Sequence, residues 1–179
     1  MRTKTIATVA TLWLGIAATT AQAATAPCLT ESEAQSLFLA VAPDAIDAVG
    51  QKCAAQLAPN ATLRGGLGAL VGRYRVAADA AWPQASLAIA KIGSADMKGV
   101  DPAMLRPMIG PMIAQMATDK MKPADCVLVD RLATQLAPLP PANTASLIVV
   151  IAQEAMRDKG KANDAPFTIC PAVPISAAK

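Results

Sequence analysis

The sequence contains no histidine. This absence excludes Ser-His-Asp and Cys-His catalysis, because both mechanisms need an imidazole as general base. It also excludes histidine-ligated zinc, copper and haem sites, and it removes the side chain that most readily exchanges a proton near neutral pH. The commonest hydrolytic and metal-dependent mechanisms therefore have no basis in this chain.

Aromatic residues are also scarce, at 3% of the chain, although 54% of its residues are hydrophobic. The core must therefore consist of Ala, Leu, Ile, Val and Met. Alanine and leucine favour helix, and the residues that favour strands are comparatively sparse. This composition predicts an all-α fold, a small bundle of about five to seven helices.

The first 23 residues show the order of features that is typical of a signal peptide. Arg2 and Lys4 precede an apolar stretch over residues 6–18, and the small-residue pattern Ala21-Gln22-Ala23 follows. The apolar stretch is shorter than the ~20 residues of a membrane-spanning helix. The sequence thus predicts general secretion, cleavage before Ala24, and a periplasmic or secreted protein with no stable membrane anchor. An uncleaved N-terminal anchor is the alternative.

The predicted mature chain, residues 24–179, has the length of a single domain. Its last part, from about residue 165, is rich in proline and predicts an irregular tail. Removing Arg2 and Lys4 leaves 14 basic and 13 acidic residues, so most of the precursor's net charge of +3 disappears. A chain so close to neutral lacks the basic character of a nucleic-acid-binding protein.

The four cysteines all belong to the predicted mature chain: Cys28, Cys53, Cys126 and Cys170. An even number of cysteines in an exported protein predicts two disulfides. Their long spacing and the absence of a C-x-x-C motif argue against a metal site. Each bridge would contribute roughly 3–4 kcal/mol by restricting the unfolded chain.

The pairing of the cysteines is predicted from the helices around them. Residues 30–33 have the pattern of a capping box and predict a helix start. Pro43 predicts the end of this helix, and residues 46–57 predict a second one with Cys53 on its apolar side. Two short helices joined by a tight turn run antiparallel, so we expect a bridge between Cys28 and Cys53.

The same reasoning applies to the C-terminal half. A helix is expected to open at Pro123, and a last helix to be capped by Asn143, with a proline-rich connector between them. Residues 147–151 are apolar on every side of this last helix, which predicts that it is buried at the centre of the domain. Since these two helices should also run antiparallel, we expect a bridge between Cys126 and Cys170.

A helix is also predicted over about residues 62–81, ending at Trp82-Pro83. Its glycines, at positions 65, 66, 68 and 72, each cost about 1 kcal/mol in a helix interior and predict a close approach by a neighbouring helix. Arg64, Arg73 and Arg75 form the chain's basic cluster and are candidate contacts for an anion or a lipid headgroup. For Arg75, however, the four-residue spacing favours a surface pair with Asp79.

Methionine recurs every four residues at Met104, Met108, Met112 and Met116. Methionine clusters can hold Cu(I), because the thioether is a soft ligand. Methionine also packs irregular cores and forms adaptable apolar binding surfaces. Pro107 and Pro111 predict a break in this helix, which would misalign the four side chains. We therefore take the segment as core or as a candidate apolar binding surface, with a copper carrier as an alternative function.

Glutamate is limited to three positions, and Glu31 and Glu33 belong to the first helix start. Glu154 follows the apolar segment 147–151 by one turn. A half-buried Glu154 with a raised pKa could act as a general acid, as in glycan-cleaving enzymes. The simpler interpretation is a solvated residue beside Arg157.

No recognisable catalytic motif remains, so the sequence predicts a non-catalytic binding or interaction protein of the cell envelope, with no cofactor and no resident metal. Its expected partner is another envelope protein or an apolar small ligand. A glycan hydrolase that uses Glu154, and a methionine-based copper carrier, are the alternatives.

Overall fold

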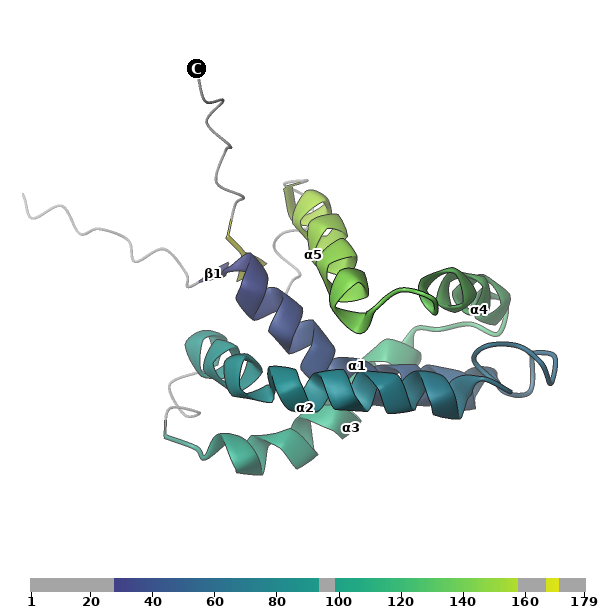
Figure 1. Ribbon diagram of the computed structural model, residues 1–179, viewed down its shortest axis with the longest axis horizontal. Coiled ribbons are helices and arrows are strands. Elements are labelled where there is room, and N and C mark those ends of the chain that lie inside the picture. The colour runs from purple at the N-terminus through teal and green to yellow at the C-terminus, as the bar shows by residue number, and fades with distance from the viewer. Residues whose placement is uncertain (1–27, 94–98, 158–166, 171–179) are drawn as a thin grey trace, which may run out of the picture.

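A computed structural model describes residues 28–93, 99–157 and 167–170 (Figure 1). Within these ranges the chain forms five helices and one two-stranded sheet: β1 (Cys28–Leu29), α1 (Glu31–Cys53), α2 (Leu67–Ile92), α3 (Pro102–Asp119), α4 (Asp125–Leu136), α5 (Pro141–Arg157) and β2 (Thr168–Ile169). The helical prediction is thus confirmed. The predicted signal peptide and most of the predicted tail lie outside the described residues. None of the five helices is long and apolar enough to cross a membrane.

The start of α1 is the capping box predicted from residues 30–33. The backbone N–H of Glu33 donates to Thr30 Oγ1 at 3.3 Å, and the backbone N–H of Thr30 donates to Glu33 Oε2 at 2.7 Å. Lys91 on α2 donates from Nζ to the same carboxylate oxygen at 2.8 Å. The Lys91 contact, and then the Thr30 N–H, lower the pKa of Glu33 below 4.5.

This lowered pKa predicts a pH dependence of stability. Because the folded state holds the Glu33 carboxylate more tightly than the unfolded chain does, its stabilisation is present above about pH 4.5 and is lost as the pH falls through the folded pKa. Glu33→Gln should therefore cost about 1 kcal/mol or less at pH 6 and less at pH 3, since the stabilisation falls with pH below 4.5. Urea unfolding at the two pH values measures this. Glu31→Gln, which leaves the capping box and Lys91 in place, is the control, and an equal cost at both pH values would contradict the assignment.

Proline does not end the helices where the sequence predicted breaks. Pro43 lies buried inside α1, Pro83 lies inside α2, and Pro107 and Pro111 both lie inside α3. Figure 1 shows that α1 changes direction near its middle, as expected for a proline that removes one backbone hydrogen bond. The predictions of a helix end at Pro43, at Trp82-Pro83 and within α3 were therefore wrong, because tertiary packing outweighs a local cost of roughly 3 kcal/mol.

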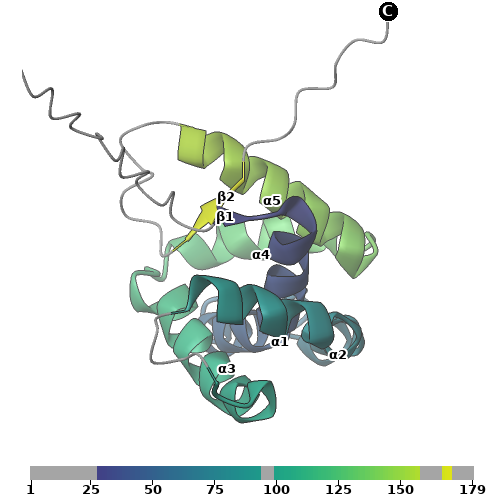
Figure 2. The same ribbon diagram turned by 90° about the vertical axis from the view of Figure 1, so that its left-hand side faces the viewer.

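The main core lies between α1, α2, the turn that joins them and the inner side of α4. Its buried members include Leu57, Leu63, Leu70 and Tyr74. α1 is the central element, since it packs against α2, α3 and α5 (Figure 2). The other helices are therefore arranged around α1, whereas the sequence predicted α5 at the centre.

Two disulfides are present, as predicted, but the predicted pairing was wrong. The bonds join Cys28 to Cys170 and Cys53 to Cys126. Because α1 runs unbroken through Pro43, its two ends stand about 30 Å apart at 1.5 Å per residue, so Cys28 cannot reach Cys53. The expected antiparallel pair of short helices, on which that pairing depended, does not exist.

The Cys28–Cys170 bond closes a small sheet that the sequence did not reveal. β1 and β2 pair in parallel, with Cys28 opposite Thr168 and Leu29 opposite Ile169. The backbone N–H of Cys170 donates to Leu29 O at 2.7 Å. Leu29 is fully buried in a second core cluster, so this part of the predicted irregular tail is a fixed structural element.

The Cys53–Cys126 bond fastens α4 to the end of α1. Both cysteines are almost fully buried, and the bond lies in the main core. The turn before α2 adds two hydrogen bonds to α4: Leu63 N–H donates to Asp130 Oδ1 at 2.8 Å, and the hydroxyls of Thr62 and Thr134 lie 2.7 Å apart. The bonds that hold α4 therefore lie on the side of the helix that faces the main core.

The glycines near the start of α2 have two different environments. A Cβ at Gly65 or Gly66 would lie within 3 Å of a backbone oxygen of the preceding turn, Pro59 O or Thr62 O respectively. Gly68 and Gly72 have nothing within 4 Å of that position. The predicted close approach of a neighbouring helix is therefore wrong for Gly68 and Gly72.

Candidate binding surfaces

The apolar segment of α5 is exposed along one side. Leu147, Val150 and Ile151 are between 43% and 55% exposed, whereas Val149 is buried. These three exposed residues follow the i, i+3, i+4 spacing of one helix face. The prediction that this segment is buried on every side was wrong, because α5 packs mainly against α1, with a smaller contact to α2, and no other described helix covers its outer side.

The outer side of α4 is apolar as well. Val127, Leu128 and Leu132 are between 53% and 58% exposed, whereas Cys126 faces the core. A shallow hollow of about 370 Å³ lies on this helix, lined by Leu128, Arg131, Leu132, Thr134 and Gln135. The one charged side chain in its lining is that of Arg131.

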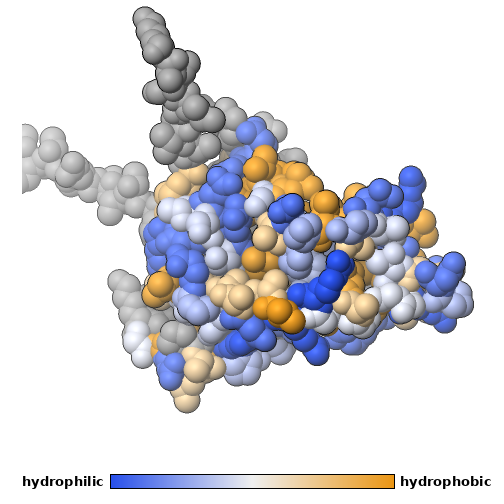
Figure 3. All heavy atoms as spheres, in the orientation of Figure 1, coloured by the Kyte–Doolittle hydropathy of each residue, from blue (hydrophilic) through white to orange (hydrophobic). Residues whose placement is uncertain are grey.

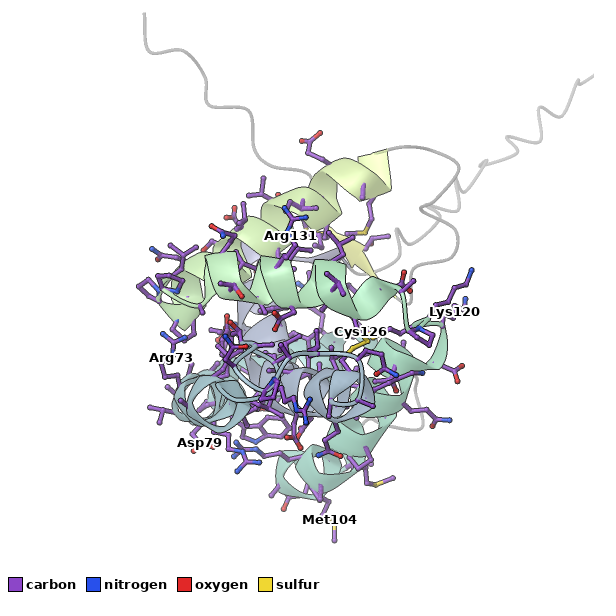
Figure 4. The ribbon with its side chains drawn as sticks, turned by 90° about the vertical axis from the view of Figure 1, so that its right-hand side faces the viewer. Arg73, Asp79, Met104, Lys120, Cys126 and Arg131 are labelled. Carbon is purple, nitrogen blue, oxygen red and sulfur yellow. A yellow bond between two sulfur atoms is a disulfide. The ribbon has the colours of Figure 1, made fainter. Side chains whose placement is uncertain are left out.

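The exposed sides of α4 and α5 belong to consecutive helices. A connector of only four residues, 137–140, joins the two helices. Hydrophobic residues gather over α5 (Figure 3), and Arg131 extends from α4 (Figure 4). We call this surface the α4–α5 face; its members are Leu128, Arg131, Leu132, Leu147, Val150 and Ile151.

The four methionines at four-residue spacing also lie on the surface. Their side chains are between 52% and 70% exposed, on the unbroken helix α3: Met104, Met108, Met112 and Met116. Met104 points away from the body of the protein in Figure 4. We call this row the methionine face. The interpretation of these residues as core was wrong, because the helix continues through Pro107 and Pro111 and its other side packs against α1.

The three candidate arginines do not form one site. Arg64 donates to the backbone carbonyl of Leu57 at 2.6 Å, and Arg73 donates to the carbonyl of Ala137, which ties α2 to the end of α4. Arg75 instead lines a cleft between α1, α2 and α3. The structure therefore does not bring these side chains together as an anion contact.

That cleft, of about 200 Å³, was not predicted from the sequence. Its charged lining residues are Asp44, Arg75, Asp79 and Arg106. Arg106 forms an ion pair with Asp79 and lies over the ring of Trp82, with its guanidinium carbon 5.2 Å from the centre. Asp79 thus pairs with Arg106, where the sequence predicted Arg75. Arg75 and Asp79 are four residues apart on α2, but Asp44 and Arg106 come from α1 and α3, so no spacing in the sequence could bring all four charges together.

Glu154 is an exposed residue of α5. A raised pKa for a general acid requires burial or a neighbouring negative charge. The exposure of Glu154 therefore gives no support to a glycan hydrolase that acts through this residue.

No protein-family model matches the chain, and no significant match was found among curated proteins or solved structures. Function must therefore be argued from these surfaces.

Proposed function

We propose that the protein is an exported, non-catalytic binding protein that holds an amphipathic helix of another envelope protein on the α4–α5 face. The observation that carries this proposal is the exposure of five large apolar side chains on two consecutive helices. Two disulfides indicate an oxidising, extracytoplasmic compartment, which is consistent with the predicted signal peptide.

The spacing of the exposed residues favours a helix as the occupant. Leu128 and Leu132 on α4, and Leu147 and Ile151 on α5, are pairs at four-residue spacing along their helices. Such rows suit an amphipathic helix, which packs by its own i, i+3, i+4, i+7 residues. Large exposed apolar side chains that gather on one side of an element mark interaction sites in soluble proteins.

The charge of the hollow defines the partner further. Arg131 is the one charged residue that lines it. We therefore expect the bound helix to carry a carboxylate opposite Arg131, inside an otherwise apolar stripe. A second copy of this chain is a poorer occupant, because a two-fold symmetric contact would place a second Arg131 in the same patch.

Site-specific crosslinking in cells tests this proposal. A photoreactive amino acid replaces Leu132 or Val150 in the full chain, expressed with its own leader in a bacterial host; Val76, which is 73% exposed on α2, is the control position. We expect both face positions to crosslink to one shared protein and Val76 not to do so. The crosslinked peptide, mapped by mass spectrometry, should show helical apolar spacing with an Asp or Glu.

Charge reversal provides the matched control. Arg131→Glu should reduce the crosslinked product by about tenfold or more, because it places like charges against each other at the contact. Lys120→Glu makes the same charge change away from the α4–α5 face and should leave the product unchanged. A product that contains only a second copy of this chain, or none at either face position, would overturn the proposal.

A further inference from the structure

We propose that the methionine face of α3 binds soft monovalent metal ions, Cu(I) and its analogue Ag(I), through its thioether sulfurs. This site is separate from the α4–α5 face and does not depend on the function proposed above. Two features support it: the soft ligands that the chain contains and the side of α3 on which the methionines lie.

The inventory leaves methionine as the available soft ligand. The sequence has no histidine, and all four of its cysteines are held in disulfides, so neither imidazole nor thiolate can compete for a soft ion. Thioethers favour Cu(I), whereas Cu(II) favours imidazole nitrogen, which is absent here. Any site for a soft metal must therefore use methionine sulfur.

The methionines of α3 lie on its solvent side, and other apolar residues lie on the side that packs against the protein. Leu105, Ile109 and Ile113 are half-buried, whereas all four methionines are more than half exposed. If these methionines filled gaps in a core, they would be buried on the packed side of α3. Four sulfur atoms are instead available to solvent without any opening of the fold.

The unbroken helix also gives these sulfurs a useful spacing. Residues at i and i+4 have their Cβ atoms about 5–6 Å apart on the same side of a helix. A flexible methionine side chain spans that gap easily, so Met104 with Met108, and Met112 with Met116, can each direct two sulfurs at one ion. We therefore expect about two ions per chain.

Silver titration followed by native mass spectrometry tests the site. Ag(I) is the main probe because it needs no reductant, so the disulfides stay intact; Cu(I) kept reduced with ascorbate is the second probe. The mature chain should take up about two ions. In a spectrum of the protein with ¹³C-labelled methionine methyl groups, the four α3 signals should shift, while those of the half-buried Met121 and Met156 stay in place.

Replacement of methionine by leucine isolates the role of sulfur. Leucine keeps the size and apolarity of the side chain and its helix propensity, so the fold and any apolar docking on α3 are preserved. Met104→Leu with Met108→Leu should leave one ion bound, and replacement of all four should leave none. Circular dichroism checks that each variant is folded.

Three results would overturn this inference: no ion bound by the unaltered chain, unchanged uptake in the fourfold variant, or methyl shifts confined to Met121 and Met156. None of these results affects the crosslinking test of the α4–α5 face, since no methionine of α3 belongs to that surface. Failure of one proposal is thus distinguishable from failure of the other.

Discussion

Replacing Cys53 and Cys126 together by serine should lower the free energy of unfolding by about 4 kcal/mol, a large share of the stability of a small domain. The bond closes a loop with a sequence separation of 73 residues, so its loss frees a long stretch of the unfolded chain. Both positions are almost fully buried, so two serine hydroxyls would also enter an apolar core. Urea unfolding followed by helical circular dichroism measures the effect.

The same double variant should also loosen α4. Since this helix is held by the bond and by its inner side only, the variant should lose protection from hydrogen exchange in α4 before α1 or α2 does. Cys28→Ser with Cys170→Ser is the matched control: it also removes one bridge, but α4 should keep its protection. A peptide map of the unreduced protein that links Cys28 to Cys53 would contradict the pairing itself.

Gly50→Val should destabilise the protein by about 3 kcal/mol. Gly50 is buried near the end of α1, and a Cβ there would lie 2.6 Å from the methyl carbons of Leu67 and 2.9 Å from the backbone oxygen of Leu63. The Leu67 side chain can turn away, but the carbonyl belongs to the turn that leads into α2. The larger valine therefore forces the two helices apart at the point where the main core is closed.

Gly72→Ala is the control with the opposite sign. Gly72 lies inside α2 with nothing within 4 Å of a new Cβ, so alanine adds helix propensity without overlap. We expect a gain of about 1 kcal/mol in the free energy of unfolding. Unfolding curves of the two variants should therefore shift in opposite directions. A loss of stability in Gly72→Ala would show that another group lies against α2 at Gly72.

The helical class and the start of α1 could be predicted because both depend on local chemistry. Alanine and leucine favour helix wherever they occur, and the Thr30–Glu33 box requires only residues three apart. The glycan-hydrolase alternative rested on Glu154 being half-buried, and burial is a tertiary property. The sequence alone therefore could not decide whether Glu154 is buried.

Proline was the main source of error, and the error spread to the disulfides. Local rules treat Pro43 as a helix end, and the predicted hairpin around it placed Cys28 beside Cys53. In the structure α1 continues through Pro43 because it packs against three other helices. Similarly, the continuity of α3 through Pro107 and Pro111 turned a predicted irregular segment into a row of aligned methionines.

The α4–α5 face was missed for a different reason. An apolar run such as residues 147–151 is read from the sequence as buried, because burial is the usual fate of such residues. The sequence does not say whether enough neighbours exist to cover all sides of the helix. Here the described helices cover only one side of α5, which leaves Leu147, Val150 and Ile151 exposed.

The two disulfides are nested, because the Cys28–Cys170 bond encloses both cysteines of the other bridge. A chain that crosses a membrane with its N-terminus first would present Cys28 and Cys53 to an oxidising catalyst long before Cys126 or Cys170 emerges. Oxidation in order of appearance therefore yields Cys28–Cys53, the wrong bond, and its rearrangement needs thiol–disulfide exchange. Correct maturation of this small helical protein should accordingly depend on a disulfide isomerase in addition to an oxidase.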